Sequence, residues 1–205
     1  MAEVLPVRIP EDKDVAGRTF PLTLAAPTDA DRPADLAAWV EAHRDRLFDA
    51  VCDHGAVLFR GFAIDTAPDF ATVVDALELE NMPYIGGAAV RQRVAGDKVL
   101  TANEAPSSEP IPFHHEMAQT PDPPHYLVFC CDIPPASGGE TPVIVSNEVY
   151  RFARSRYPKF MDQVEKLGVR YIRILPEEDD PASAIGRSWK STYDAQTRKE
   201  AEARM

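Results

Sequence analysis

A histidine and a glutamate stand two positions apart in the segment Ile111–Gln119, which reads IPFHHEMAQ. We expect this segment to be a strand, in which side chains at positions i and i+2 point to the same face. His114 and Glu116 would then converge on one point, while His115 would point away from it. An imidazole and a carboxylate are two of the three donors in the facial set that binds non-haem iron(II). The spacing therefore predicts two thirds of an iron site.

The context of this triplet favours a metal over incidental surface polarity. The surrounding stretch is apolar, and a charged, unpaired Glu116 there would be costly unless a cation satisfied it. A second histidine would complete the set, but none follows residue 125; the histidines are His43, His54, His114, His115 and His125. His115 or His125 would serve as the third ligand only with an unusual geometry, because alternation turns His115 away from Glu116.

The first third of the chain reads as strands and helices in turn. Phe20–Leu24 alternates like a short strand, and Ala56–Phe62 is a continuous apolar strand. Between them, Pro33–Asp53 has apolar residues at helical spacing, and Gly55 is a suitable C-terminal stop. Thr66, with an acidic residue three positions later, predicts the start of a helix that runs to about Leu79.

The remainder predicts a sheet with two more helices. Strands are expected at His125–Ile133, Glu140–Val145 and Val169–Leu175, and helices at Ser146–Arg156 and Pro158–Leu167. Beyond residue 176 the chain is polar and predicts a solvated helix or tail. The fold class expected from this order is α+β, with helices first and then strands of an antiparallel sheet or barrel.

Composition narrows the classes of partner. The chain has 205 residues and a formal charge of −11, so it lacks the basic footprint of a protein that binds nucleic acid or an anionic membrane. Three cysteines without metal-ligand spacing argue against a disulfide framework or a zinc site. The chain shows neither a signal-peptide pattern nor an apolar run of membrane-spanning length. We therefore expect a soluble, cytoplasmic protein.

Several motifs, in this order and spacing, resemble the taurine dioxygenase (TauD/TfdA-like) family of iron(II)/2-oxoglutarate oxygenases. They are RGF at 60–62, HxE at 114–116 and GGET at 138–141. The segments NEAP at 103–106 and GRSWKS at 186–191 resemble the clavaminate synthase-like branch, which uses Glu where most relatives carry Asp. The resemblance runs from about Phe20 to the last residue.

The resemblance implies a double-stranded β-helix, or jelly-roll, with flanking helices. It implies iron(II) bound by His114 and Glu116, with 2-oxoglutarate as a cosubstrate that chelates the metal and hydrogen-bonds Thr141. It also implies oxidation of a small, amino-acid-like substrate. Asn103 and Arg91 are candidates for contacting that substrate; the alternatives are a turn role for Asn103 and a solvated position for Arg91.

The sequence departs from the family pattern in its last third. Family members carry a distal histidine and then an arginine that binds 2-oxoglutarate, and neither follows the GGET segment here in the required pattern. We therefore expect residues 1–205 to form a single oxygenase-like domain that is the N-terminal two thirds of the family's fold and is incomplete as an enzyme. Residues 176–205 are expected to be a polar insertion or tail.

Four interpretations stay open at this point. The chain is an oxygenase recorded as a fragment, a non-catalytic remnant or binding module, half of a two-chain enzyme, or a metalloenzyme of another class such as a cupin-type isomerase. An unfinished sheet would expose strand edges, which pair readily with a second copy or with a partner chain.

Overall fold

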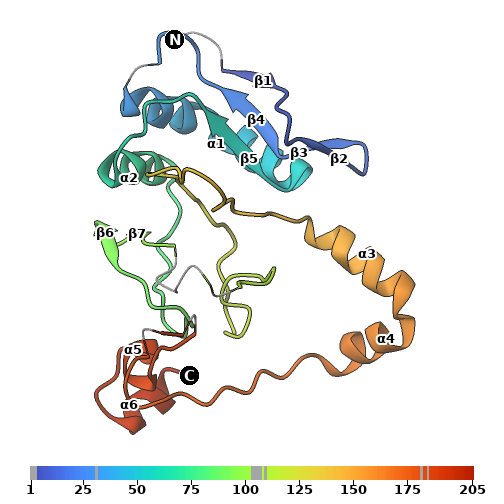
Figure 1. Cartoon of the computed structure of the whole chain (residues 1–205), viewed down its shortest axis with the longest axis vertical. Coiled ribbons are helices and arrows are strands. Elements are labelled where there is room, and N and C mark those ends of the chain that lie inside the picture. Colours follow the sequence, from blue (N-terminus) through green and yellow to red (C-terminus); the bar gives the residue numbers. More distant parts are fainter. Residues whose placement is uncertain (1–3, 31, 103–107, 109, 181, 184) are drawn as a thin grey trace. The chain divides into compact units, whose positions relative to one another are not determined.

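The computed structural model describes residues 4–205 except 31, 103–107, 109, 181 and 184. It has a mixed α and β architecture that divides into two compact units (Figure 1). The first unit comprises Met1–Asn81, Arg93–Leu100 and Val128–Pro134. The second comprises Met82–Gln92, Thr101–Leu127 and Pro135–Met205.

The first unit contains a three-stranded sheet with the order β1 (Leu5–Val7), β4 (Leu22–Ala25) and β5 (Val57–Arg60). β1 and β4 are antiparallel, whereas β4 and β5 are parallel, with Leu22 opposite Val57. A parallel pair needs a crossover connection, and α1 (Pro33–His54) provides it. These elements confirm the strands predicted near residues 20–24 and 56–62.

Two helices of the first unit enclose its hydrophobic core. α1 has Pro33 in its first turn and ends at Gly55, whose φ of 79° suits glycine. In α2 (Ala67–Ala76) the Thr66 side chain accepts a hydrogen bond from the Asp69 amide, which confirms the predicted start. The core side chains between the helices are Leu36, Ala37, Val40, Leu47, Val73 and Leu77.

Two short hairpins complete the first unit. β2 (Lys13–Val15) pairs with β3 (Arg18–Phe20), and β6 (Arg93–Ala95) pairs with β7 (Val99–Leu100). The second hairpin is joined to α2 by an ion pair of 2.7 Å between Lys98 and Asp75.

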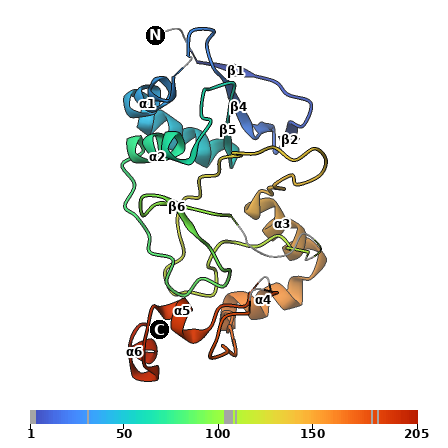
Figure 2. The ribbon, with the colours of Figure 1, turned by 60° about the vertical axis from the view of Figure 1, so that its left-hand side comes forward.

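Among its described residues, the second unit has four helices and long connecting segments. α3 (Ser146–Arg156) and α4 (Pro158–Leu167) follow one another with a single residue between them (Figure 2). Their ranges confirm both predicted helices. α5 (Trp189–Tyr193) and α6 (Arg198–Ala203) lie in the C-terminal segment, where Thr192, Ala195 and Ala201 are buried.

Three predicted strands are wrong in this structure. Residues 125–133, 140–145 and 169–175 are all described, and they form neither helix nor strand. A strand requires a partner for its backbone hydrogen bonds, and within the described residues no neighbouring segment pairs with these. Their apolar side chains are accordingly exposed, up to 93% at Ile174. The predicted apolar alternation is present in the sequence, but alternation alone does not form a sheet.

The observed fold confirms the α+β class, with small sheets. The jelly-roll and the division into one domain with a polar tail stay predictions. Within the described part of the chain, none of the helices has the length and apolar character needed to cross a bilayer.

Candidate metal centre

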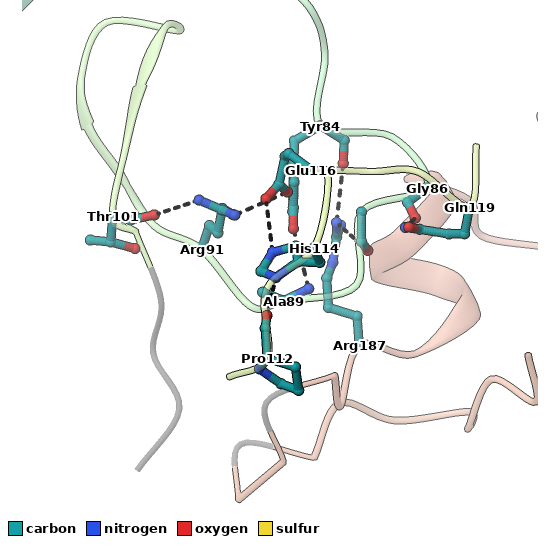
Figure 3. A network of polar contacts seen from close by, with 11 residues as sticks. Tyr84, Gly86, Ala89, Arg91, Thr101, Pro112, His114, Glu116, Gln119 and Arg187 are labelled. Carbon is teal, nitrogen blue, oxygen red and sulfur yellow. Dashed lines mark hydrogen bonds and ion pairs between the residues drawn. The ribbon is translucent and has the colours of Figure 1, made fainter. Parts of the chain in front are cut away.

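The structure brings His114 and Glu116 together, although the segment that carries them is not a strand. Residues 110–115 are irregular and residues 116–119 form a turn, so the predicted strand is wrong here. Nevertheless His114 Nε2 lies 3.7 Å from Glu116 Oε2 (Figure 3). Met117, with a φ of 53° and a buried side chain, follows directly. The convergence therefore arises in irregular backbone that leads into a turn, and not from strand alternation.

His114 is oriented by a backbone carbonyl. Its Nδ1 lies 2.8 Å from the carbonyl oxygen of Pro112. A carbonyl only accepts hydrogen bonds, so this contact requires the proton on Nδ1. In the neutral imidazole the lone pair is then on Nε2, the atom that faces Glu116. Metal-bound histidines usually donate their second ring N–H in this way, because the bond fixes the tautomer and the ring orientation.

His115 points to a different partner. Its Nε2 lies 2.6 Å from the hydroxyl oxygen of Ser146, the first residue of α3. The structure thus pairs Glu116 with His114, as the sequence analysis predicted, and engages His115 elsewhere.

Arg91 is not a solvated side chain. Its side chain is 18% exposed, and its Nη2 lies 3.0 Å from Glu116 Oε1. Its guanidinium carbon lies 4.7 Å from the centre of the Tyr84 ring, within the range of a cation–π contact. The carboxylate that Arg91 contacts is therefore a residue of this chain; its predicted role toward a substrate stays a prediction.

A second arginine fixes the loop that carries Tyr84. Arg187 Nη1 donates to the carbonyl oxygens of Tyr84 (3.1 Å) and Gly87 (3.2 Å), and its guanidinium carbon lies 5.3 Å from the Tyr84 ring centre. Figure 3 shows Arg91 and Arg187 on either side of Tyr84. A Cβ at Gly87 would lie 2.2 Å from the Tyr84 ring, so this packing requires glycine. Burial lowers the pKa of Arg187.

Among the described residues, Thr141 and His125 are not joined to this pair. Thr141 lies in an exposed, irregular segment, and in the described part of the chain no hydrogen bond connects it to His114 or Glu116. Its predicted contact with 2-oxoglutarate stays a prediction. Asn103 lies outside the described residues. His125 is exposed.

The pair fits a divalent metal in chemistry and in distance. The 3.7 Å between Nε2 and Oε2 is shorter than the roughly 4.2 Å sum of two typical metal–ligand bonds, so one ion can contact both atoms. A metal ion or a proton on Nε2 would make this approach of the two atoms favourable. Among the described residues, however, no group of three or more His, Cys, Asp or Glu side chains is placed to hold a metal ion. The described part of the chain thus supplies two donors.

Sequence reasoning missed Tyr84 and the contacts of Arg187. Tyr84 lies 7 residues from Arg91 but 103 residues from Arg187, and no periodic pattern connects the three side chains. The two adjacent glycines at 86 and 87 were the available signal, because consecutive glycines permit a close approach of a ring to the backbone.

Comparison with known proteins agrees with the resemblance. Residues 18–202 match the family described as "Taurine catabolism dioxygenase TauD, TfdA family". A clavaminate synthase-like protein of Arabidopsis thaliana is 42% identical over 212 residues, which cover all of this chain and 64% of the relative. The dapdiamide synthesis protein DdaC of Enterobacter agglomerans is 26% identical over 150 residues, 73% of this chain and 43% of the relative.

The match covers most of the chain, including the HxE and GGET segments, while the chain spans less than two thirds of the length of either relative. The chain therefore belongs to the TauD, TfdA dioxygenase family.

Proposed function

We propose that this chain carries two ligands of an iron(II)/2-oxoglutarate oxygenase, His114 and Glu116. The observation that carries the proposal is the 3.7 Å approach of His114 Nε2 to Glu116 Oε2, with the Nδ1 proton held by the Pro112 carbonyl. Membership of the dioxygenase family supports it. The chain spans only 64% of the length of the Arabidopsis relative. The oxygenase activity of this chain is therefore proposed together with its ligands.

The roles of the side chains follow from their chemistry. Bound iron(II) would supply open coordination positions for 2-oxoglutarate and O₂. His114 would bind the metal through Nε2, and the hydrogen bond from its Nδ1 to the Pro112 carbonyl fixes the orientation of the ring. Glu116 would bind the metal through Oε2, while Arg91 contacts Oε1. Thr141 is proposed to bind a carboxylate of 2-oxoglutarate.

We propose a small, amino-acid-like substrate, with Asn103 and Arg91 as candidate contacts. The family supports a small-molecule substrate in general. The same family supports a double-stranded β-helix as the complete fold.

Anaerobic titration of the purified chain with iron(II) and 2-oxoglutarate tests the proposal. A chelated complex has a metal-to-ligand charge-transfer band in the visible region, and we expect this band to depend on both components. Succinate formation after exposure to O₂ measures turnover. The matched control is Glu116→Ala, which should remove the band.

The outcomes separate the alternatives. Metal binding without a charge-transfer band would support a binding module or a cupin-like metalloenzyme that does not use 2-oxoglutarate. A band without succinate would support a site that binds its ligands and does not turn over. The absence of both metal binding and the band would refute the proposal for this polypeptide.

A second candidate function is pairing with another polypeptide, as expected of half of a two-chain enzyme. The exposed apolar side chains at Leu167, Val169, Ile172 and Ile174 favour it. Sedimentation across a range of concentrations would show self-association; a strictly monomeric chain would leave only a different partner chain.

A further inference from the structure

The two oxygens of Glu116 have different partners. Oε1 lies 3.0 Å from Arg91 Nη2, and Oε2 lies 3.7 Å from His114 Nε2. The Glu116 side chain is 15% exposed, so few water molecules compete for either oxygen. A carboxylate held in this way presents one oxygen toward the imidazole and keeps the other on the arginine.

Arg91 is itself fixed at several points. Its Nη1 lies 3.4 Å from the carbonyl oxygen of Thr101, and the guanidinium stacks over the Tyr84 ring at 4.7 Å. Tyr84 is held in turn, because its hydroxyl accepts a hydrogen bond from the Ala89 amide. The guanidinium therefore approaches Glu116 from an anchored position, as a rigid planar group does when it sets a carboxylate's orientation.

The position of Arg91 costs free energy. Its Nε is buried and has no hydrogen-bond partner among the described residues. Leaving a buried donor without a hydrogen-bond partner is unfavourable. The contacts of the guanidinium with Glu116, Thr101 and Tyr84 are what this position provides in return.

We propose that Arg91 is a positioning residue for the metal ligand Glu116. By holding Oε1 it leaves Oε2 as the single oxygen that binds the metal beside His114. This inference rests on the proposed function, since it concerns the same metal. The alternative is that Arg91 competes with the metal for Glu116. Removing the Arg91 guanidinium should weaken metal binding if Arg91 positions Glu116, and should strengthen it if Arg91 competes.

Titration of the full chain with manganese(II) separates the positioning role from competition. The EPR signal of free Mn²⁺ measures how much of the metal is bound. Loss of the partner of a metal ligand typically lowers metal affinity 10–100-fold. We therefore expect Arg91→Met to weaken Mn²⁺ binding by about 10-fold or more. Arg91→Lys, which keeps the charge but not the planar fork, should recover part of the affinity. Arg93→Met is the matched control, because that arginine is exposed and pairs with Asp97 instead, and it should leave the affinity unchanged.

Infrared difference spectra of the metal-loaded and metal-free chain provide a readout that a purely structural role would not change. The splitting between the two carboxylate stretches is wide for a carboxylate bound through one oxygen and narrow for one bound through both. We expect a wide splitting in the unmodified chain and a narrower one in Arg91→Met, with Glu116→Gln assigning the bands.

Equal or tighter Mn²⁺ binding by Arg91→Met would overturn the positioning role while leaving the metal site intact. An unchanged splitting would also overturn it. If the unmodified chain binds no Mn²⁺, the proposed metal site fails, and the role of Arg91 fails with it. Circular dichroism of each variant identifies any loss of affinity that comes from unfolding.

Discussion

The core of the first unit and the cluster around Glu116 in the second unit are stabilised by different forces. The core consists of aliphatic side chains that α1 and α2 remove from water. The Glu116 cluster, defined as Tyr84, Arg91, His114, Glu116 and Arg187, consists of ion pairs, cation–π contacts and hydrogen bonds between particular atoms. Apolar packing is non-directional, whereas the cluster depends on the placement of single atoms. Substitutions in the core should therefore change stability, and substitutions in the cluster should change ligand binding.

The largest effect on stability is expected at Leu36 in α1. This side chain is 4% exposed, so Leu36→Ala removes buried methyl groups and leaves a cavity. We expect a loss of about 2–5 kcal/mol in the free energy of unfolding, measured by denaturant titration. The matched control is Leu167→Ala at the end of α4, where the side chain is 76% exposed. Its effect should stay within about 0.5 kcal/mol.

A substantial loss of stability in Leu167→Ala would contradict the exposed position of that side chain. It would indicate that the apolar segments around residues 167–174 are covered in solution, by a second copy of the chain or by another partner. Repeating the measurement at several protein concentrations would then distinguish the two, because only self-association makes stability depend on concentration.

The next effect is expected in metal affinity. Glu116→Ala removes the charged donor and should abolish measurable binding of iron(II), whereas His115→Ala should leave most of it, because His115 contacts Ser146 instead. Calorimetric titration with iron(II) under anaerobic conditions measures both. Equal losses of iron affinity in the two variants would show that His115 belongs to the metal site, which would contradict its contact with Ser146.

The elements that sequence predicted well are those with local signals. Gly55 ends α1 and Thr66 with Asp69 begins α2, and each signal acts within a few residues of the helix end. The segments at 125–133 and 169–175 carry an equally clear strand pattern. A strand forms only with a partner, however, and a pattern within one segment does not reveal whether that partner is present.

The same distinction applies to the candidate site. The pairing of His114 with Glu116 was predicted from residues two positions apart, although the irregular backbone that produces it was not. The contacts of Glu116 with Arg91, and of Tyr84 with Arg187, join segments separated by 25 and 103 residues. Irregular loops carry them, so no periodicity in the sequence indicates which side chains meet.

A smaller effect is expected at the start of α2. The Thr66 hydroxyl accepts a hydrogen bond from the Asp69 amide, one of the donors that a helix leaves without an internal partner. Thr66→Ala should lower the free energy of unfolding by about 1 kcal/mol, and Thr66→Ser should restore most of it. Thermal denaturation followed by circular dichroism measures both variants. An unchanged stability in Thr66→Ala would show that water replaces the cap without cost.

The smallest effect is expected from the carboxylate beside α5. Burial acts to raise the pKa of Asp179, but hydrogen bonds from Ser191 and Ser188 together outweigh it, so the pKa lies below its usual value of 3.8. A carboxyl whose pKa is lowered on folding contributes stability that is fully present above its unfolded pKa and is lost as the pH falls through the folded one.

The NMR shift of the Ser188 amide, which donates to Asp179 at 2.6 Å, should therefore change with a midpoint below 3.8. Asp179→Asn should abolish this transition, whereas Asp122→Asn, at an exposed position of the same unit, should leave it unchanged. A midpoint above 3.8 would mean that desolvation outweighs the hydrogen bonds, and the polar contacts of the second unit would then be weaker than their distances indicate.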